Sequence, residues 1–407
     1  MADPQFTVRT LSAEEFDAFQ AVENAAFLAD RRPEVEQRRR ALFEPERTHG
    51  AFQAGEMIGA AQVCTRSMTL PGVGPQPVAA VTGVAVAPGH RRRGVLTALM
   101  RAQLTALHEA GGEPVAVLWS SESEIYGRFG YGLAAGHARL AVPAGAAFRP
   151  GVPTSPAPVR EMSREDALPL LAKVYDEAAA GRVGHLTRSP AAWAAQLADE
   201  EYLRDGCTSY RFAVHPEGYA VYRAKPAWGD RGPDGQLRVR EMVATTPAGY
   251  AATWRYLLDV DLIAELRWEV AAVDEPLVHL LANARAAVMR VSDALWVRPV
   301  DVPRALALRG YAATVDLVFE VADEFCPWNA GRWRLAVDGD GRAEVSRTDR
   351  APDLALDVAD LGAAYLGGTT LATLAAAGRV RERVPGALAA ATRAFAGDRP
   401  PHCAEIF

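Results

Sequence analysis

The sequence predicts a multidomain protein that combines the α/β and α+β fold classes. Its 407 residues exceed one ordinary domain, so two or three are expected. The run 143–158, rich in Pro, Gly, Ala and Ser, is the clearest linker. The order hairpin, strand, loop, helix occurs on both sides of this linker, and the end of the chain places strands before helices. We therefore expect three units, at 1–148, 149–297 and 298–407.

Composition limits the possible functions. Hydrophobic content of 49% and charged content of 23% are typical of a folded protein. A net charge of −6 disfavours nucleic-acid binding and favours cationic substrates. Residues 1–5 lack the pattern of a signal peptide, and no apolar run is long enough to cross a bilayer. We expect a cytoplasmic protein that does not attach to membranes.

The four cysteines, Cys64, Cys207, Cys326 and Cys403, are far apart and form no CxxC pair. A structural zinc site and a disulfide framework are therefore both disfavoured, and reduced packing is expected. The neighbours His402 and Cys403 have no evident third ligand, so we predict no metal.

The first unit opens with a strand at 6–9. Ser12 and Glu15 have the spacing of a capping box, which starts a helix that runs to about Phe27. The arginine-rich segment 30–40 follows. Phe52 and 57–65 predict a hairpin. Residues 68–70 then lead into a tight turn at 71–75.

A strand, a basic glycine loop and a helix come next. The apolar run 81–87 ends at a Pro-Gly turn and is followed by Arg91-Arg92-Arg93-Gly94 and a helix-period segment that begins at Val95. A helix N-terminus offers unpaired N–H groups and a favourable dipole to an anion. The pattern therefore favours phosphate or pyrophosphate, although a solvated surface turn is the commoner use of an arginine–glycine turn alone. The loop has neither the P-loop nor the Rossmann glycine spacing.

A second pattern follows the next buried strand, 114–119. Ile125-Tyr126-Gly127-Arg128 runs into Phe129-Gly130-Tyr131-Gly132, and 135–142 would be the last strand of the unit. On its own, Tyr126 could be an aromatic side chain packed under a glycine turn. Beside the basic loop, it becomes a candidate catalytic group.

The spacing arginine, two residues, glycine at 91–94 resembles the acetyl-CoA loop of the GNAT N-acetyltransferases. Leu96 stands where that family usually has Gly or Ala. Taken with 125–132, the chain length and the final Phe407, the sequence is similar to the Eis (enhanced intracellular survival) branch of actinobacteria. The resemblance implies two tandem GNAT-like domains, the second degenerate, then a sterol-carrier-protein-like domain. It also implies acetyl-CoA as cosubstrate and a homohexamer.

The resemblance also assigns roles. Tyr126 would give a proton to the departing thiolate, and the Phe407 carboxylate would hold the ammonium and accept its proton. The expected acetyl-CoA contacts are the strand Val84, Ala85 and Val86, the loop Arg91, Arg92, Arg93 and Gly94, the helix start Val95, Leu96 and Thr97, and Ser120 and Ser121. Phe27, Asp30 and Glu405 are candidates for the acceptor pocket. The simpler interpretations are a solvated helix face for 30–40 and turn formation for the two serines.

The later units lack this pattern. A hairpin at 212–222, a strand at 237–244 and a helix that continues through Trp254 repeat the order of the first unit, but 245–250 has no arginine–glycine loop. This half should not bind a CoA pyrophosphate. In the third unit, 315–321 alternates as a strand, 333–345 forms a hairpin, a further strand covers 354–358 and helices follow to 396. Its apolar residues favour an ordinary core over a lipid tunnel.

The sequence thus predicts an N-acetyltransferase, an acyltransferase that moves acetyl directly from acetyl-CoA to a primary amine, with aminoglycosides as the expected acceptors. Two alternatives stay open. Protein lysine or a polyamine could be the acceptor, which leaves the chemistry unchanged. A lipid or ligand carrier built on the third unit would need neither the basic loop nor Tyr126.

Overall fold

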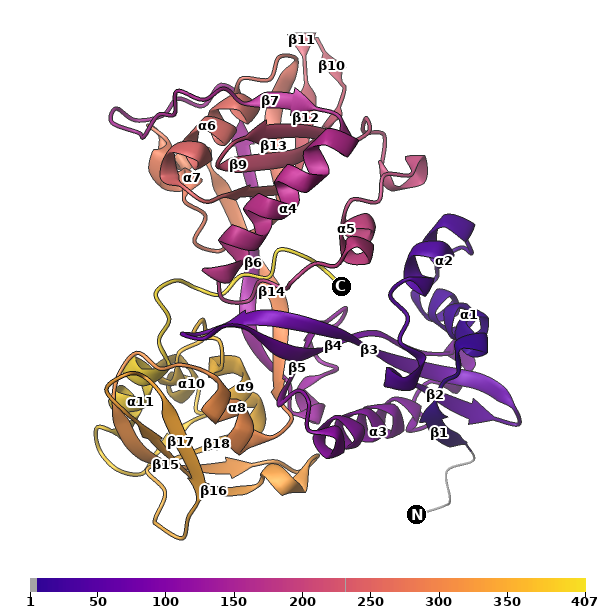
Figure 1. The fold of residues 1–407 in the computed structure, drawn as a ribbon, viewed down its shortest axis with the longest axis vertical. Helices are drawn as coiled ribbons and strands as arrows, with labels where there is room; N and C mark the ends of the chain where they lie inside the picture. The colour runs from indigo at the N-terminus through magenta and orange to yellow at the C-terminus, as the bar shows by residue number, and fades with distance from the viewer. Residues whose placement is uncertain (1–5, 231) are drawn as a thin grey trace.

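The computed structural model describes residues 6–230 and 232–407 (Figure 1). One sheet of twelve strands runs through the first and second units, a five-stranded sheet belongs to the third, and two short strands pair separately. Residues 1–5, whose sequence lacks a signal-peptide pattern, lie outside the described residues.

The strands of the large sheet follow one another in space in an order that differs from the sequence. That order is β1 (Thr7–Thr10), β2 (Thr48–Gln53), β3 (Glu56–Leu70), β4 (Gly74–Val86), β5 (Val115–Trp119), β14 (Val288–Pro299), β6 (Gly132–Pro143), β13 (Ile263–Ala271), β12 (Gly235–Ala244), β9 (Gly218–Lys225), β8 (Arg211–His215) and β7 (Arg160–Met162). The third unit has the order β17 (Ala343–Arg347), β16 (Gly331–Val337), β15 (Val315–Ala322), β18 (Leu354–Asp357) and β19 (Arg381–Glu382), and the separate pair is β10 (Trp228–Gly229) and β11 (Gly232–Pro233).

The helices are short, apart from two of sixteen and seventeen residues that cover the sheet in the first two units. They are α1 (Phe16–Phe27), α2 (Pro33–Arg40), α3 (Val95–Ala110), α4 (Arg164–Ala180), α5 (Pro190–Gln196), α6 (Pro247–Leu258), α7 (Leu277–Leu280), α8 (Val302–Leu308), α9 (Val358–Ala364), α10 (Leu371–Ala376) and α11 (Ala387–Phe395).

Local capping starts the first helix of the first unit, as predicted, and the first helix of the second unit. The Ser12 N–H donates to Glu15 Oε2 at 2.9 Å, which completes a capping box, and a short 3₁₀ turn then leads into α1. In the second unit, Ser163 Oγ accepts from the Asp166 N–H at 3.1 Å and starts α4. In both places a side chain satisfies a backbone group that the helix itself leaves unpaired.

One strand of the large sheet, β14, has a position that local sequence patterns do not predict. β14 lies between β5 and β6, pairing antiparallel with both, although about 145 residues separate β6 from β14 along the chain. The other edge of β6 pairs with β13 of the second unit. β6 and β14 therefore run through the waist between the two halves (Figure 1), and the halves share one continuous sheet.

The third unit packs onto this waist. A side chain at Gly132 of β6 would collide with the backbone of Ala359, and one at Gly362 of α9 would collide with the backbone of Val297. Glycine at both positions lets α9 lie directly on β6 and β14. Next to this contact, Arg298 and Asp323 form a fully buried ion pair at 2.7 Å.

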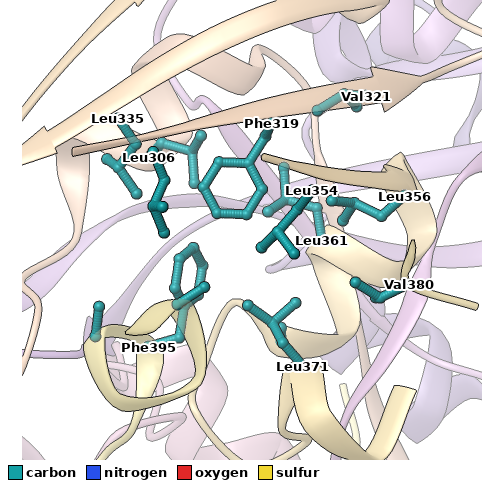
Figure 2. Close-up of a cluster of buried hydrophobic side chains, with 14 of the residues drawn as sticks. Leu306, Phe319, Val321, Leu335, Leu354, Leu356, Leu361, Leu371, Val380 and Phe395 are labelled. Atoms are coloured by element: carbon teal, nitrogen blue, oxygen red, sulfur yellow. The ribbon is translucent and has the colours of Figure 1, made fainter. Parts of the chain in front are cut away.

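Figure 2 shows the interior of the third unit. Leu335 and Phe319 from its sheet, Leu361 from α9 and Phe395 from α11 point toward one another. The rings of Phe319 and Phe395 lie 6.0 Å apart between centroids. These side chains form the packed core that the sequence predicts for this unit.

Candidate active site

A gap between two parallel strands creates the candidate site. β4 and β5 pair only at Ala79 with Ala116 and at Ala80 with Val117, and then diverge. Beyond this point, the edge of β4 that faces β5 has no strand partner. A cavity of about 910 Å³ opens there and is lined by Val84, Ala85 and Val86. An extended ligand could pair with this free strand edge as a further strand would.

The basic loop forms the wall next to this edge. Gly94 precedes α3 with φ +83°, and no atom lies within 4 Å of the position that a Cβ would take there. Arg92 also has a positive φ, of 61°. Arg91 is anchored, because its Nη2 donates to the Ala26 carbonyl at 3.3 Å. The first N–H groups of α3 have no helical partner, so helix dipole and arginines together favour an anion at this wall.

Tyr126 closes the opposite wall at the entrance of a 3₁₀ turn, Gly127–Phe129. Its side chain is buried, and its ring meets Tyr131 edge to face with centroids 5.8 Å apart. Burial raises the pKa of Tyr126 to about 12. The hydroxyl therefore stays protonated at neutral pH and can donate a hydrogen bond to a charge that develops in the cavity.

Most of the predicted acetyl-CoA contacts line this one cavity. The residues that do so are Val84, Ala85, Val86, Arg91, Arg92, Gly94, Val95, Leu96, Thr97 and Ser121. Tyr126 and the acceptor candidate Phe27 line it too. Arg93 is exposed beside the cavity, and the Ser120 hydroxyl donates to the Glu122 carbonyl at 2.6 Å within the turn.

The other acceptor candidates lie outside this cavity. The Asp30 side chain is 87% exposed, and its nearest ion-pair partner is Arg32, at 3.7 Å. The neighbouring helix α2 reaches the second unit, where Arg38 pairs with Glu200. Glu405 is buried and pairs with Arg66 and Arg188, so its carboxylate already has two partners.

Further residues of the cavity were not predicted individually: Ala26, Leu28, His90, Glu122, Ile125 and Arg128. All are sequence neighbours of predicted residues. Leu28 ends α1 with a left-handed φ of 55° and is 91% exposed, which no apolar pattern indicates. His90 lines the same cavity, and its buried Nδ1 has no hydrogen-bond partner.

The chain ends next to the sheet, on the face opposite Tyr126. Phe407 is half-buried and packs against a cluster that contains Val78 and Ala80. The alternate residues of β4, Ala79 and Val81, belong to the cluster of Tyr126. Because successive side chains of a strand point to opposite faces, Tyr126 and Phe407 approach the β4–β5 opening from its two sides.

A larger cavity, of about 1090 Å³, lies in the second unit between the linker and α6. Two of its arginines, Arg211 and Arg255, are paired with Glu161 and Asp259. This cavity lies away from the diverging strands β4 and β5 and, among its described residues, has no arginine–glycine loop like that at 91–94. We therefore assign acetyl transfer to the smaller cavity beside β4.

Two further features bear on cofactors and membranes. Within residues 6–230 and 232–407, no group of three or more His, Cys, Asp or Glu side chains is arranged to hold a metal. Over the same residues, no helix combines the length and apolar character needed to cross a bilayer.

Comparison with known proteins follows the same division of the chain. Residues 7–134 and 184–299 match two families described as acetyltransferase (GNAT) domains, and 302–404 match the sterol carrier protein domain. The chain is thus two GNAT-type domains followed by a sterol-carrier-like domain. GNAT membership makes it an N-acetyltransferase and implies acetyl-CoA as cosubstrate.

Relatives resemble the chain over most of its length. An uncharacterized N-acetyltransferase of Streptomyces avermitilis is 43% identical over 374 residues, which cover 88% of this chain and 89% of that protein. The N-acetyltransferase Eis of Mycobacterium tuberculosis is 36% identical over 366 residues, covering 88% of each. The crystal structure of Eis1 from Mycobacterium abscessus superposes with a TM-score of 0.85 at 35% identity, over 98% of this chain and 100% of that one. The chain therefore belongs to the Eis family of GNAT N-acetyltransferases.

Proposed function

We propose that the protein transfers the acetyl group of acetyl-CoA directly to a primary amine of a cationic small molecule, an aminoglycoside, in a ternary complex. The observation that carries the proposal is one cavity bounded by a free strand edge, a cationic loop at a helix N-terminus and a buried tyrosine. These are the groups needed to hold a thioester arm, a pyrophosphate and a developing thiolate.

Acetyl-CoA binds along the two walls of the cavity. Its pyrophosphate meets Arg91, Arg92 and the N–H groups of α3 after Gly94, with Arg93 adding long-range charge. The pantetheine arm pairs with the free edge of β4 from Val84 to Val86. N–H groups of that edge polarise the thioester carbonyl and stabilise the oxyanion of the tetrahedral intermediate.

Tyr126 acts as a hydrogen-bond donor to the leaving sulfur. The amine attacks the thioester carbon, the C–S bond breaks and negative charge collects on sulfur. With the tyrosine pKa at about 12 and a thiol near 8.5, complete proton transfer is uphill by roughly 5 kcal/mol. A strong hydrogen bond that forms as the thiolate develops stabilises the transition state without that cost.

The amine enters from the side of the C-terminus. The Phe407 carboxylate orients the ammonium and passes its proton to water, since an α-carboxyl pKa of about 3.5 makes it a poor base. The packing of the Phe407 ring against the sheet supports this role. Phe27 lines the entrance, Asp30 attracts the cation from nearby, and the ion pairs of Glu405 fix the segment that ends in Phe407.

Incubation with acetyl-CoA and a panel of aminoglycosides, polyamines and lysine peptides, read by mass spectrometry, tests the acceptor class. We expect acetyl additions to aminoglycosides. Acetyl additions to peptides or polyamines alone would show that the acceptor is protein lysine or a polyamine and not an aminoglycoside. If acetyl-CoA does not bind, the central proposal fails. The result would then favour the lipid or ligand carrier, which needs neither the basic loop nor Tyr126.

A variant extended beyond Phe407 by Gly-Ser-Gly-Ser tests the terminal carboxylate. We expect acetyl-CoA binding to persist while the transfer rate falls by at least about tenfold, the loss of one charge-assisted contact. Full activity in the extended protein would show that the terminal carboxylate has no catalytic part. Phe407→Leu without the extension keeps the terminal carboxylate and removes the ring, so it separates the ring's packing from the carboxylate.

We also propose that the reaction takes place in the cytoplasm and in a homohexamer. All four cysteines are unpaired, which fits a reducing compartment. The hexamer rests on the family resemblance, and light scattering of the purified protein tests it.

A further inference from the structure

The second unit repeats the strand divergence that forms the candidate active site. β12 and β13 pair in parallel up to Val239 and Trp268 and then separate, β12 continuing along β9 and β13 along β6. A cavity of about 380 Å³ lies in the gap. Its volume is at the lower end of small-molecule sites, about 300–1,000 Å³.

The walls of this cavity differ from those of the first. The helix that follows β12 is α6, whose N-terminus is capped by its own residue, since Thr246 Oγ1 accepts from the Gly249 N–H at 3.0 Å. The next wall is the C-terminal segment 399–404, which carries Arg399 and His402 into the cavity lining. Among its described residues, this cavity therefore lacks a loop like that at 91–94 that could bind a CoA pyrophosphate.

Buried nitrogen atoms without partners surround the cavity. Trp268 Nε1, His185 Nδ1, His402 Nδ1 and Arg182 Nε have no hydrogen-bond partner, and the first three side chains belong to residues no more than 7% exposed. Indole and guanidinium nitrogens can only donate, and a neutral imidazole donates from one nitrogen. No unpaired buried oxygen occurs among the described lining residues, so a ligand that offers acceptors matches the indole and guanidinium N–H groups and the donor tautomer of each imidazole.

Charge on one wall favours an anionic acceptor. Asp274 lies between two arginines and accepts from Arg182 at 2.5 Å and from Arg399 at 2.7 Å. Two guanidinium groups on one carboxylate leave a net positive charge at the rim. The lining acid Glu241 already pairs with Arg188 at 2.6 Å, so it does not cancel this charge. A second lining acid, Glu177, is exposed to solvent, and a third arginine, Arg240, also lines the cavity.

The deep wall presents a carboxyl group that is partly neutral. Glu275 accepts a hydrogen bond from Tyr250, and burial raises its pKa to about 7. In its protonated form it adds a further donor, and it repels an anion less than an exposed glutamate would.

From this arrangement we propose that the cavity between β12, β13 and the C-terminal segment is a second ligand site, which binds a small carboxylate through Trp268, His185, His402 and the Arg182–Arg399 rim. The carboxylate oxygens accept from the indole N–H and from the two imidazoles. The site is distinct from the acetyl-CoA cavity, because no residue lines both.

Calorimetric titration of the full-length protein with sodium malonate tests the site. Trp268→Phe keeps the buried ring and removes the donor, and Trp228→Phe is the matched control, since Trp228 is 73% exposed on β10. We expect Trp268→Phe to weaken malonate binding by about tenfold or more, as for one hydrogen bond to a charged group, and Trp228→Phe to leave it unchanged. Malonamide, the neutral analogue, should bind at least about tenfold more weakly than malonate.

Other outcomes would overturn the proposal. Absence of malonate, acetate or succinate binding would mean that water satisfies the unpaired donors. Equal binding to wild type and Trp268→Phe would place the anion elsewhere, such as the loop at Arg91. Equal binding of malonamide would remove the charge requirement. Should Trp268→Phe misfold by circular dichroism, Arg399→Gln replaces it, since that side chain is 53% exposed and its loss removes one rim charge while Arg182 still pairs with Asp274.

Discussion

Arg188 and Glu405 form a buried ion pair, with Nε 2.6 Å from Oε2 and both side chains at most 1% exposed. The pair ties the second unit to the segment that ends in Phe407. Arg188 also holds Glu241 through both Nη atoms, and Arg66 holds the other oxygen of Glu405. One network therefore joins the first unit, the second unit and the C-terminus.

Glu405→Gln should disrupt this network, because it removes the negative charge that Arg66 and Arg188 share. It leaves Arg66 and Arg188 buried without a full counter-charge, which typically costs about 3–5 kcal/mol of unfolding free energy. Urea unfolding measures the loss. We also expect the rate of acetyl transfer to fall at unchanged acetyl-CoA affinity, because the segment that holds Phe407 loosens.

The matched control is Asp316→Asn, which breaks exposed pairs with Arg334 and Arg350 in the third unit. Exposed pairs contribute about 0–1 kcal/mol, so this variant should unfold nearly as the wild type does. Similar losses in both variants would contradict the central role given to Glu405.

Tyr126→Phe should lower kcat by about 10- to 100-fold and leave the KM for acetyl-CoA unchanged, because it removes a hydrogen bond worth about 1.5–3 kcal/mol that forms only with the thiolate. Since the pKa of Tyr126 is raised to about 12 by burial, the wild-type rate should show no fall from tyrosine ionisation up to pH 9.5. Steady-state rates across pH 7–9.5 provide both measurements.

Tyr131→Phe is the control within the same aromatic cluster. The Tyr131 hydroxyl is buried without a partner, so its removal should preserve activity and leave stability unchanged or higher by up to about 1 kcal/mol. A fall in kcat in this variant equal to that of Tyr126→Phe would refute a specific role for Tyr126.

Gly94→Ala should raise the KM for acetyl-CoA. Alanine at φ +83° is strained by about 1–2 kcal/mol, so the loop that holds the pyrophosphate shifts. Gly89→Ala is the comparison, because it too has no atom within 4 Å of the added Cβ but lacks a positive φ. In binding titrations, CoA should bind more weakly to Gly94→Ala than to Gly89→Ala. Equal affinities of the two variants would show that the positive φ of Gly94 does not control CoA binding.

His185 makes stability depend on pH. Burial and the nearby Arg182 lower its pKa to about 3, whereas an unfolded histidine titrates near 6.5. Between these values the unfolded state binds the extra proton, so stability is full above about pH 6.5 and falls by about 1.4 kcal/mol per pH unit as pH drops.

Glu275 acts in the opposite direction. Its raised pKa, about 7, gives stability at low pH that is lost as pH rises from about 4.3 toward 7. His185→Gln isolates the histidine: urea unfolding at pH 7 and pH 5 should show a smaller acid loss than wild type. The exposed His279→Gln serves as control, and equal slopes in wild type and His185→Gln would disprove the assignment.

Sequence patterns located the loop at Arg91 and the tyrosine turn because each is local: a strand, a glycine with special φ and a helix start follow one another within a few residues. Ser12 and Glu15 marked the start of the first helix for the same reason. Glu405 could not be placed in this way. The family resemblance made it a candidate for the acceptor pocket, whereas the fold brings Arg66 and Arg188, both distant in sequence, to its two oxygens.

The position of β14 in the sheet could not be predicted from the sequence either. Its first half is largely exposed and its last six residues are all buried, so it lacks the alternation of a half-buried strand. The choice of β5 and β6 as neighbours depends on contacts across more than a hundred residues. Asp30 shows the same limit at the site: the family resemblance made it a candidate for one acceptor pocket with Phe27, but Leu28 ends α1 with a left-handed residue and the carboxylate lies in solvent.

The late arrival of β14 has a consequence during synthesis. After β6 leaves the ribosome, about 145 further residues must be translated before β14 can enter the gap beside it, which at roughly 5–20 residues per second is on the order of 10 s. For that time the nascent N-terminal half carries two open strand edges, those of β5 and β6, and open edges promote pairing with other chains. We therefore expect its folding to depend on translation rate, and on chaperones that shield nascent strands, more than the folding of a chain whose domains close one after another.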